Sequence, residues 1–218
     1  MKTPQIKEFD SFPLLKNSPT LMCAHFEAVS HIVVHPKELE HAERLRTEKR
    51  RREFLAGRRL VKVALGDIGP ILPSEKRVPL FPNGIHASLS HSEGYVGLLH
   101  ATEQPLGLDI QIERSVSRGF QQRVCASKEE HKMAPVNVFS AKEAAYKALS
   151  PWHDFIFFPR FIELREIDGG TFSVLKIRGE QPLKPVLISQ FTIPDVVDGR
   201  ACIISVAGVP NNTDCYRG

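Results

Sequence analysis

The residues best suited to chemistry lie in the segment FSAKEAAYKAL, residues 139–149. It is rich in alanine and contains no glycine or proline, which predicts a helix. Glu143 and Lys147 stand four residues apart, so on a helix they share one face, about a turn from each other. A carboxylate beside an ammonium can bind a metal ion and move a proton. The same spacing also fits an ordinary helix ion pair, which stabilises a helix by about 0.2–0.5 kcal/mol.

A third interpretation of this segment concerns only helix formation. Ser140 and Glu143 have the spacing of a capping box. In that motif the serine closes the start of the helix, and the glutamate binds back to the backbone of the first turn. The residues of this segment alone leave all three interpretations open.

A second candidate segment, GLDIQIER at residues 107–114, alternates apolar and polar residues and therefore predicts a strand. Asp109, Gln111 and Glu113 fall on one face of that strand. Acidic residues two apart on such a face form an oxygen-rich site for a hard divalent cation. The alternative is the solvated face of an edge strand.

A strongly basic stretch lies in the first half of the chain. Nine basic and two acidic residues occur between residues 44 and 62. A helix is predicted from Thr47, a suitable N-cap, to about residue 65, with Gly66 positioned to end it. The basic side of this helix is either a solvated face or a phosphate-binding surface. Binding to nucleic acid is the weaker hypothesis, because Phe54 is the single aromatic residue in the stretch.

The remaining elements predict a mixed α/β (α+β) protein. Residues 1–19 contain several prolines and suggest an irregular lead-in, and residues 21–34 have the composition of one or two strands. A short helix is expected at residues 37–46, strands at 86–91 and 95–101, and hairpins within 161–177 and 191–206. Each half of the chain thus has a long helix accompanied by antiparallel strands.

The composition is that of a globular protein. The chain has 218 residues, 42% of them hydrophobic, and a formal net charge of +4, which permits an anionic partner without requiring one. The four cysteines have no C-x-x-C spacing, which favours free thiols in a reducing compartment. No apolar run approaches the length of a membrane span, and the first residues lack the apolar stretch of a secretion signal. These features predict a cytoplasmic protein.

Four blocks, in order, resemble the 4'-phosphopantetheinyl transferase superfamily, in particular its Sfp-type, enterobactin synthase component D-like members. The blocks are KRRREFLAGR at 49–58, SLSHSEGY at 88–95, GLDIQIER at 107–114 and FSAKEAAYKA at 139–148. The resemblance implies a pseudo-twofold, two-lobe fold in which each half packs a long helix on a small antiparallel sheet. The expected lobes are residues 1–105, on the coenzyme A phosphate side, and 106–218, with the metal site and the catalytic helix.

The resemblance also implies an activity. Such enzymes transfer the 4'-phosphopantetheine arm of coenzyme A to a serine of an acyl or peptidyl carrier protein, depend on Mg²⁺, and release adenosine 3',5'-bisphosphate. The expected role is activation of siderophore, nonribosomal peptide or related synthases by a monomeric enzyme. The alternative is a non-catalytic module of the same fold that binds coenzyme A and the carrier protein.

Site residues follow from the positions within the matching blocks. Asp109, Gln111 and Glu143 would hold the metal, and either Glu143 or Lys147 would take the serine proton. Within the blocks, Arg50, Arg58, Ser90 and His91 are implied to contact the phosphates of coenzyme A. Lys76 is added outside them, because it stands where the family places a lysine or similar residue before a W/F-P-x-G turn. Gln111 departs from the family, since many relatives have a glutamate there, and the lost negative charge predicts a weaker or more water-dependent metal site.

Overall fold

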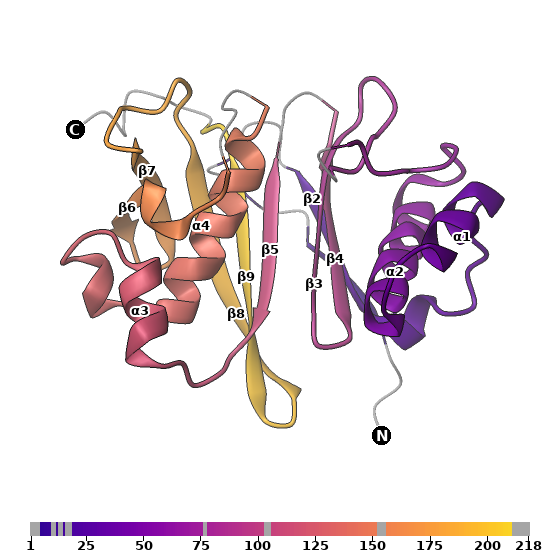
Figure 1. Cartoon of the computed structure of the whole chain (residues 1–218), viewed down its shortest axis with the longest axis horizontal. Helices are drawn as coiled ribbons and strands as arrows, with labels where there is room; N and C mark the ends of the chain where they lie inside the picture. Colours follow the sequence, from indigo (N-terminus) through magenta and orange to yellow (C-terminus); the bar gives the residue numbers. More distant parts are fainter. Residues whose placement is uncertain are drawn as a thin grey trace.

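The computed structural model describes residues 5–9, 12, 15, 19–75, 78–102, 106–151 and 156–210. Two antiparallel sheets stand side by side, and each carries a long helix on its outer side (Figure 1). This arrangement confirms the predicted α/β class, with a long helix on a small sheet in each half. Among the described residues, no helix is both long enough and apolar enough to cross a membrane.

The first sheet has the strand order β1-β2-β4-β3. Its strands are β1 (Ile6–Phe9), β2 (Thr20–His25), β3 (His86–Ser92) and β4 (Tyr95–Ala101). The short 3₁₀ helix η1 (Phe26–Val29) follows β2, and two α-helices, α1 (Pro36–Glu43) and α2 (Glu48–Leu65), come next along the chain. A core of α2 and sheet residues, with Leu60 and Leu98 fully buried, joins the long helix to this sheet.

Helix α2 has the ends that its sequence predicts. The hydroxyl of Thr47 accepts a hydrogen bond from the backbone N–H of Arg50 and so caps the first turn. Gly66 ends the helix with a φ of 74°, a conformation that glycine adopts without steric cost. The helix is thereby fixed over its 18 residues.

The second sheet has the strand order β5-β9-β8-β7-β6. Its strands are β5 (Gly107–Ile112), β6 (Ile162–Asp168), β7 (Thr171–Ile177), β8 (Leu187–Val197) and β9 (Arg200–Gly208). Its helices are α3 (Arg118–Val124), α4 (Pro135–Leu149) and the short 3₁₀ segments η2 (Glu130–Lys132) and η3 (Pro159–Phe161). Helix α4 packs its alanine-rich face on this sheet, with Ala141, Ala144 and Ala148 fully buried.

The two sheets share a core as well as a border. Leu21 and Leu99 of the first sheet belong to one buried cluster with Leu108 and Ile204 of the second. The edge strands β3 and β5 run next to each other at the centre of the molecule (Figure 1). The segments with the predicted chemistry, on β3, β5 and α4, therefore converge at this border.

Two local expectations, on residues 6–9 and on the capping box, are wrong, and a third is met in part. Residues 6–9 of the expected irregular lead-in form β1, because Ile6–Phe9 pairs in register with β2. Of the one or two strands expected within residues 21–34, one forms, which is β2, and the chain then turns after η1 toward α1. The capping box is also absent: α4 begins four residues earlier than Phe139, at Pro135, where the fixed φ of proline suits a first helical position.

Candidate active site

A row of serine hydroxyls joins the two sheets. Alternate residues of β3 accept hydrogen bonds from alternate backbone N–H groups of β5: Ser88 from Leu108 at 3.0 Å, Ser90 from Ile110 at 3.1 Å and Ser92 from Ile112 at 3.2 Å. We call these three bonds the serine seam. Because β5 is an edge strand, these N–H groups point away from its own sheet, and the seam gives them the partners that a neighbouring strand would supply.

Asp109 lies in the middle of the seam and is only 4% exposed. Its Oδ1 accepts a hydrogen bond from the hydroxyl of Ser90 at 3.1 Å, and its Oδ2 accepts one from Nε2 of Gln111 at 2.9 Å. The ammonium of Lys147 lies 3.4 Å from Oδ1. Three donors from three elements thus orient a buried carboxylate, and this burial excludes the interpretation of a solvated strand face for Asp109.

Lys147 connects α4 to β5. Its Nζ donates a hydrogen bond to the backbone carbonyl of Leu108 at 2.7 Å, beside the contact with Asp109. Gly107 permits this close packing, because a Cβ there would stand 1.8 Å from the carbonyl oxygen of Ala144. The glycine that precedes the strand motif is therefore required by the approach of the helix.

Glu143 faces the same group from one turn earlier in α4. Burial raises the pKa of its carboxyl from 4.5 to about 7; the ammonium of Lys147 opposes the rise and the charge of Asp109 adds to it. Glu143 makes no hydrogen bond or ion pair with another residue in the described part of the chain. The carboxylate of Glu143 is desolvated, lies near a second carboxylate, and receives no hydrogen bond from any described residue. Such a group is suited to bind a cation.

The other polar residues of the β5 motif have different surroundings. Gln111 uses its amide NH₂ to bind Asp109, which leaves Oε1 with no hydrogen bond to any residue that the structure describes. Glu113 lies beyond the end of β5, is exposed, and contacts Ala201 through its backbone N–H. Gln111 therefore belongs to the Asp109 group, and Glu113 does not.

His91 links this group to α2. Its Nδ1 lies 3.5 Å from a carboxylate oxygen of Glu53, and the imidazole side chain is 47% exposed. Partial burial lowers the pKa of His91, while the carboxylate of Glu53 acts in the opposite direction. Smaller effects of Lys147 and Asp109 on the same pKa place His91 within electrostatic range of both.

The two predicted arginines of α2 differ in environment. Arg50 is exposed and its side chain pairs with no residue among those described. Arg58 is only 6% exposed: its Nε donates to the carbonyl of Ile71 at 2.6 Å, and its guanidinium lies 4.1 Å from the ring centre of Phe54. Burial lowers the pKa of Arg58 to about 10, with Glu38 opposing. Lys76, the third predicted cation, lies outside the described residues.

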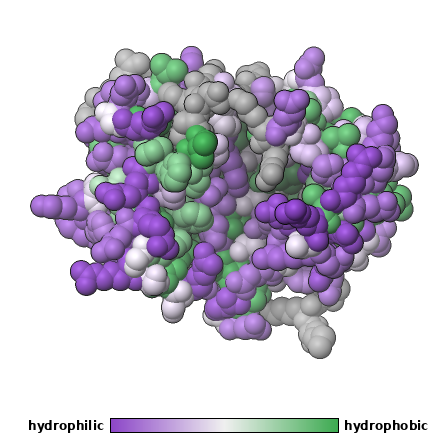
Figure 2. Space-filling model, viewed as in Figure 1, coloured by the Kyte–Doolittle hydropathy of each residue, from purple (hydrophilic) through white to green (hydrophobic). Residues whose placement is uncertain are grey.

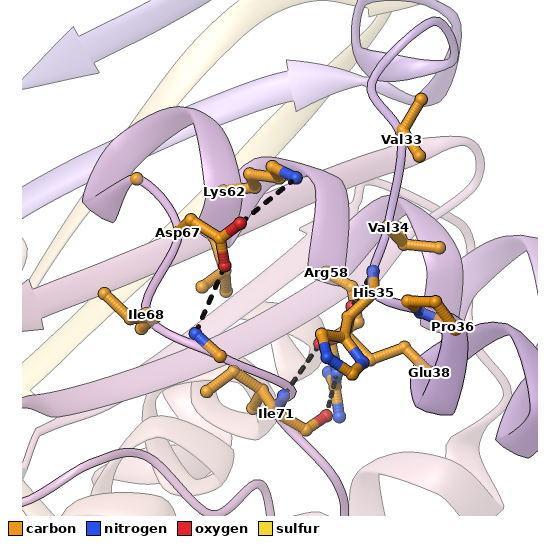
Figure 3. A pocket seen from close by; sticks show the side chains of 13 residues that line it. Val33, Val34, His35, Pro36, Glu38, Arg58, Lys62, Asp67, Ile68 and Ile71 are labelled. Carbon is orange, nitrogen blue, oxygen red and sulfur yellow. Dashed lines mark hydrogen bonds and ion pairs between the residues drawn. The ribbon is translucent and has the colours of Figure 1, made fainter.

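Arg58 forms part of the wall of a cavity of about 240 Å³ between the start of α1, α2 and residues 66–71 (Figure 3). Glu38 lies beside Arg58 in this wall, and its carboxylate accepts hydrogen bonds from the N–H groups of Ile71 at 2.7 Å and His35 at 3.1 Å. None of the residues around Asp109 lines this cavity. In this structure the partners of Arg58 are those of a residue that holds the 66–71 segment against α2.

Sequence patterns did not indicate the buried ion pair that anchors α4. Nζ of Lys142 lies 2.8 Å from Oε2 of Glu130 and donates to the carbonyl of Val124 at 2.9 Å, with both charged side chains fully buried. Oε1 of Glu130 also accepts the N–H of Leu164 on β6 at 2.8 Å. The two residues lie twelve apart on different elements, so no helical or strand spacing connects them.

Ser140, assigned to the capping box in one interpretation, instead lies fully buried inside α4. Its hydroxyl shares a hydrogen bond of 2.9 Å with the hydroxyl of Ser205 on β9. Together with the Lys142–Glu130 pair, this contact fixes the rotation of α4. Glu143 and Lys147, three and seven residues after Ser140, lie on the same side of the helix as Ser140, and Lys147 contacts β5 there.

The donor set fits Mg²⁺. Within the described residues, no group of three or more histidine, cysteine or acidic side chains is placed to hold a metal ion by itself. Two carboxylates, Asp109 and Glu143, and one amide oxygen, Oε1 of Gln111, are the protein oxygens of this group. Mg²⁺ is usually held by one or two carboxylates together with water and substrate phosphates, so a small set of this kind is sufficient.

Comparisons with known proteins give the class of the protein, which is a transferase. The family model of the 4'-phosphopantetheinyl transferase N-terminal domain matches residues 39–101. The chain is 30% identical over 157 residues to 4'-phosphopantetheinyl transferase PptT of Mycobacterium tuberculosis, covering 57% of this chain and 69% of that protein. It therefore belongs to the 4'-phosphopantetheinyl transferase family, as its four sequence blocks predict.

Two further relatives are similar. The transferase Npt of Nocardia iowensis is 30% identical over 132 residues, which cover 54% of this chain and 59% of the relative. Enterobactin synthase component D of Salmonella typhi is 33% identical over 155 residues, which cover 64% and 66% respectively. The chain thus spans less than two thirds of both of these relatives.

Proposed function

We propose that the protein transfers the 4'-phosphopantetheine arm of coenzyme A to a serine hydroxyl of an acyl or peptidyl carrier protein. One observation carries the proposal. Asp109 and Lys147, 38 residues apart, are in direct contact, and Glu143 stands within electrostatic range of both. We assign the reaction of the 4'-phosphopantetheinyl transferase family to this arrangement because the chain belongs to that family.

In the proposed reaction the serine oxygen attacks the β-phosphorus of coenzyme A. A new P–O bond forms to the serine, the bond between the two phosphates breaks, and adenosine 3',5'-bisphosphate leaves. Asp109, Glu143 and the amide oxygen of Gln111 would hold Mg²⁺, which when bound neutralises negative charge on the diphosphate. The ammonium of Lys147, fixed by the carbonyl of Leu108, would face the transferring phosphate and stabilise its charge.

Two residues are candidates for taking the serine proton. Glu143 is one, because a carboxylate with a pKa of about 7 can accept a proton near neutral pH. Lys147 is the other, if it loses its own proton first. The two roles predict different effects of Glu143→Gln, which keeps the metal-facing oxygen but cannot act as a base.

Coenzyme A would approach between α2 and the Asp109 group. Arg50 is exposed on α2 with no competing partner in the described structure, which supports a phosphate contact. His91, half exposed between Glu53 and Lys147, supports a second. Lys76 stays in the proposal on its sequence position alone, and Arg58 would need to exchange its interior partners for a phosphate.

The carrier protein is the proposed macromolecular partner. Hydrophilic residues dominate the surface over α1 and α2 (Figure 2), and Arg46, Arg50 and Arg52 are exposed there without an ion-pair partner among the described residues. A basic surface of this kind would attract an acidic carrier. The similarity to enterobactin synthase component D favours a siderophore or peptide assembly line. The proposal includes a cytoplasmic monomer, and the free thiols of Cys23, Cys125 and Cys202 are consistent with a reducing compartment.

Incubation with coenzyme A, Mg²⁺ and a purified apo-carrier protein tests the function. The expected result is a gain in carrier mass equal to one phosphopantetheine, absent when the modified serine is replaced by alanine. Tight binding of coenzyme A with no gain in mass over a panel of carriers would instead support the non-catalytic module. Nucleic-acid affinity that falls steeply with salt and is not displaced by coenzyme A would contradict both.

A further inference from the structure

The middle serine of the seam differs from its two neighbours. Ser88 and Ser92 each accept one backbone hydrogen bond from β5 through the hydroxyl. Ser90 accepts the equivalent bond from Ile110 and also donates to Oδ1 of Asp109 at 3.1 Å. The seam therefore touches the candidate metal ligand at one point only, among the residues that the structure describes.

The single proton of the Ser90 hydroxyl is already used in this arrangement. A serine hydroxyl has a single proton to donate, and the N–H of Ile110 fixes the side from which the oxygen accepts. The proton therefore points to Asp109, and the residue is buried. To donate to a phosphate of coenzyme A, Ser90 would have to release Asp109.

We propose that Ser90 is a positioning residue, which orients the carboxylate of Asp109 toward the cation while it ties β3 to β5. The inference rests on the proposed function, and it replaces the phosphate contact that the sequence block implied for Ser90. Oδ1 of Asp109 is shared by Ser90 and Lys147, and Oδ2 is held by Gln111. Without Ser90, no described neighbour on β3 restrains the carboxylate.

The serine seam supplies its own controls. Ser90→Ala, Ser88→Ala and Ser92→Ala each remove one seam bond, but only Ser90→Ala also removes the contact with Asp109. Binding of Mn²⁺ to the full chain without coenzyme A, followed by electron paramagnetic resonance, measures the cation site directly. The Mg²⁺ concentration for half-maximal transfer to a carrier protein measures it in the reaction.

Loss of a residue that orients a metal ligand typically weakens metal binding by about 10–100-fold. We expect Ser90→Ala to weaken Mn²⁺ binding and to raise the Mg²⁺ requirement by about tenfold or more. Ser88→Ala and Ser92→Ala should lower the urea midpoint to a similar extent and leave both metal readouts unchanged. If Ser90→Ala does not fold, Ser90→Cys fills the same space with a much weaker donor and should weaken Mn²⁺ binding in the same direction.

Two results would overturn the inference. The first is equal Mn²⁺ binding in all three variants. The second is a raised KM for coenzyme A in Ser90→Ala with an unchanged metal requirement, which would restore the phosphate contact. Failure of the proposed function looks different: the wild-type protein would not modify any carrier, while the selective loss of Mn²⁺ binding in Ser90→Ala would still be measurable.

Discussion

The ammonium of Lys147 lies 3.4 Å from Oδ1 of Asp109, although 38 residues separate the two along the chain. Lys147 belongs to α4 and Asp109 to β5, so this contact connects the helix and the strand that hold the candidate ligands. The same ammonium also donates to the carbonyl of Leu108 at 2.7 Å. Lys147 therefore has a fixed position before any substrate arrives.

Replacing Lys147 by methionine keeps the length of the side chain and removes its charge. The carbonyl of Leu108 then loses its donor and Asp109 loses a positive neighbour, so we expect a stability loss of about 1–2 kcal/mol in urea unfolding. We expect the transfer rate to fall by about 100-fold or more, because charge on the transferring phosphate is no longer stabilised. Lys147→Arg, which keeps the charge, should retain more of the rate. A loss of stability with an unchanged transfer rate would show that Lys147 has only a structural role.

Glu143 gives the metal-free protein a distinctive pH dependence. Its pKa is about 7 in the folded state and 4.5 for an unperturbed carboxyl, so between these values the folded state binds more protons than the unfolded state. Stability contributed by this residue therefore falls as pH rises from 4.5 to 7. Glu143→Gln removes the titration and should be more stable than wild type by about 2–3 kcal/mol above pH 7, with no difference in acid.

Urea unfolding with a chelator, over a series of pH values, measures this difference between Glu143→Gln and the wild type. Adding Mg²⁺ should stabilise the wild type more at a pH above the folded-state pKa of Glu143 than below it, since only the ionised carboxylate binds the cation. Parallel stability curves for the two proteins would show that the Glu143 carboxyl is not desolvated.

Gln111 affects the site in two opposing ways. Its amide donates to Asp109, which a glutamate cannot do, so Gln111→Glu places a second carboxylate beside a buried one. We expect the metal-free Gln111→Glu protein to be less stable, and its Mg²⁺ requirement for transfer to be lower by about tenfold. Glu113→Gln, which changes an exposed carboxylate beyond β5, is the matched control and should alter neither. An unchanged metal requirement in Gln111→Glu would contradict a role for residue 111 in metal binding.

Periodicity and turn signals were sufficient to predict most of the elements. The alternation of residues 107–112 and the Thr47 and Gly66 ends of α2 are local features that appear unchanged in the structure. The strand β1 was missed because its four residues lie in a proline-rich segment and become a strand only by pairing with β2. Pairing of this kind depends on tertiary structure, which no local pattern contains.

In the candidate site too, some residues are indicated by local patterns and others depend on tertiary structure. Asp109, Glu143 and Lys147 could be selected by residue type and spacing, whereas the role of Ser90 depends on how β3 and β5 meet. The difference between Arg50 and Arg58 also could not be predicted. They lie eight positions apart on one helix, and only packing against Phe54 and Ile71 makes Arg58 an interior residue.

The Lys142–Glu130 pair should be the most sensitive part of the α4 anchor. Lys142→Met leaves Glu130 buried without its counter-ion, and breaking a buried pair in this way typically costs about 3–5 kcal/mol. Glu130→Gln in the same background removes the unpaired charge and should recover part of the loss. Urea unfolding of the two single variants and the double variant gives the coupling free energy. Additive losses would mean that the two charges do not interact.

Arg50 and Arg58 should separate binding from stability. Arg50→Ala removes an exposed side chain, so we expect unchanged unfolding and a KM for coenzyme A raised by about tenfold. If the contact is to the 3'-phosphate, dephospho-coenzyme A should bind the variant and the wild type equally. Arg52→Ala, an exposed arginine on the same helix, controls for loss of general positive charge.

Arg58→Ala should behave differently. It leaves the carbonyl of Ile71 without its donor and exposes a face of Phe54, so we expect a stability loss of about 2 kcal/mol or more in urea unfolding. If the interior contacts are the main role of Arg58, the rise in KM for coenzyme A should be no larger for Arg58→Ala than for Arg52→Ala. Both should be measured under conditions in which the variants remain folded. A large, 3'-phosphate-dependent rise in KM would show that Arg58 leaves Ile71 to bind the cofactor.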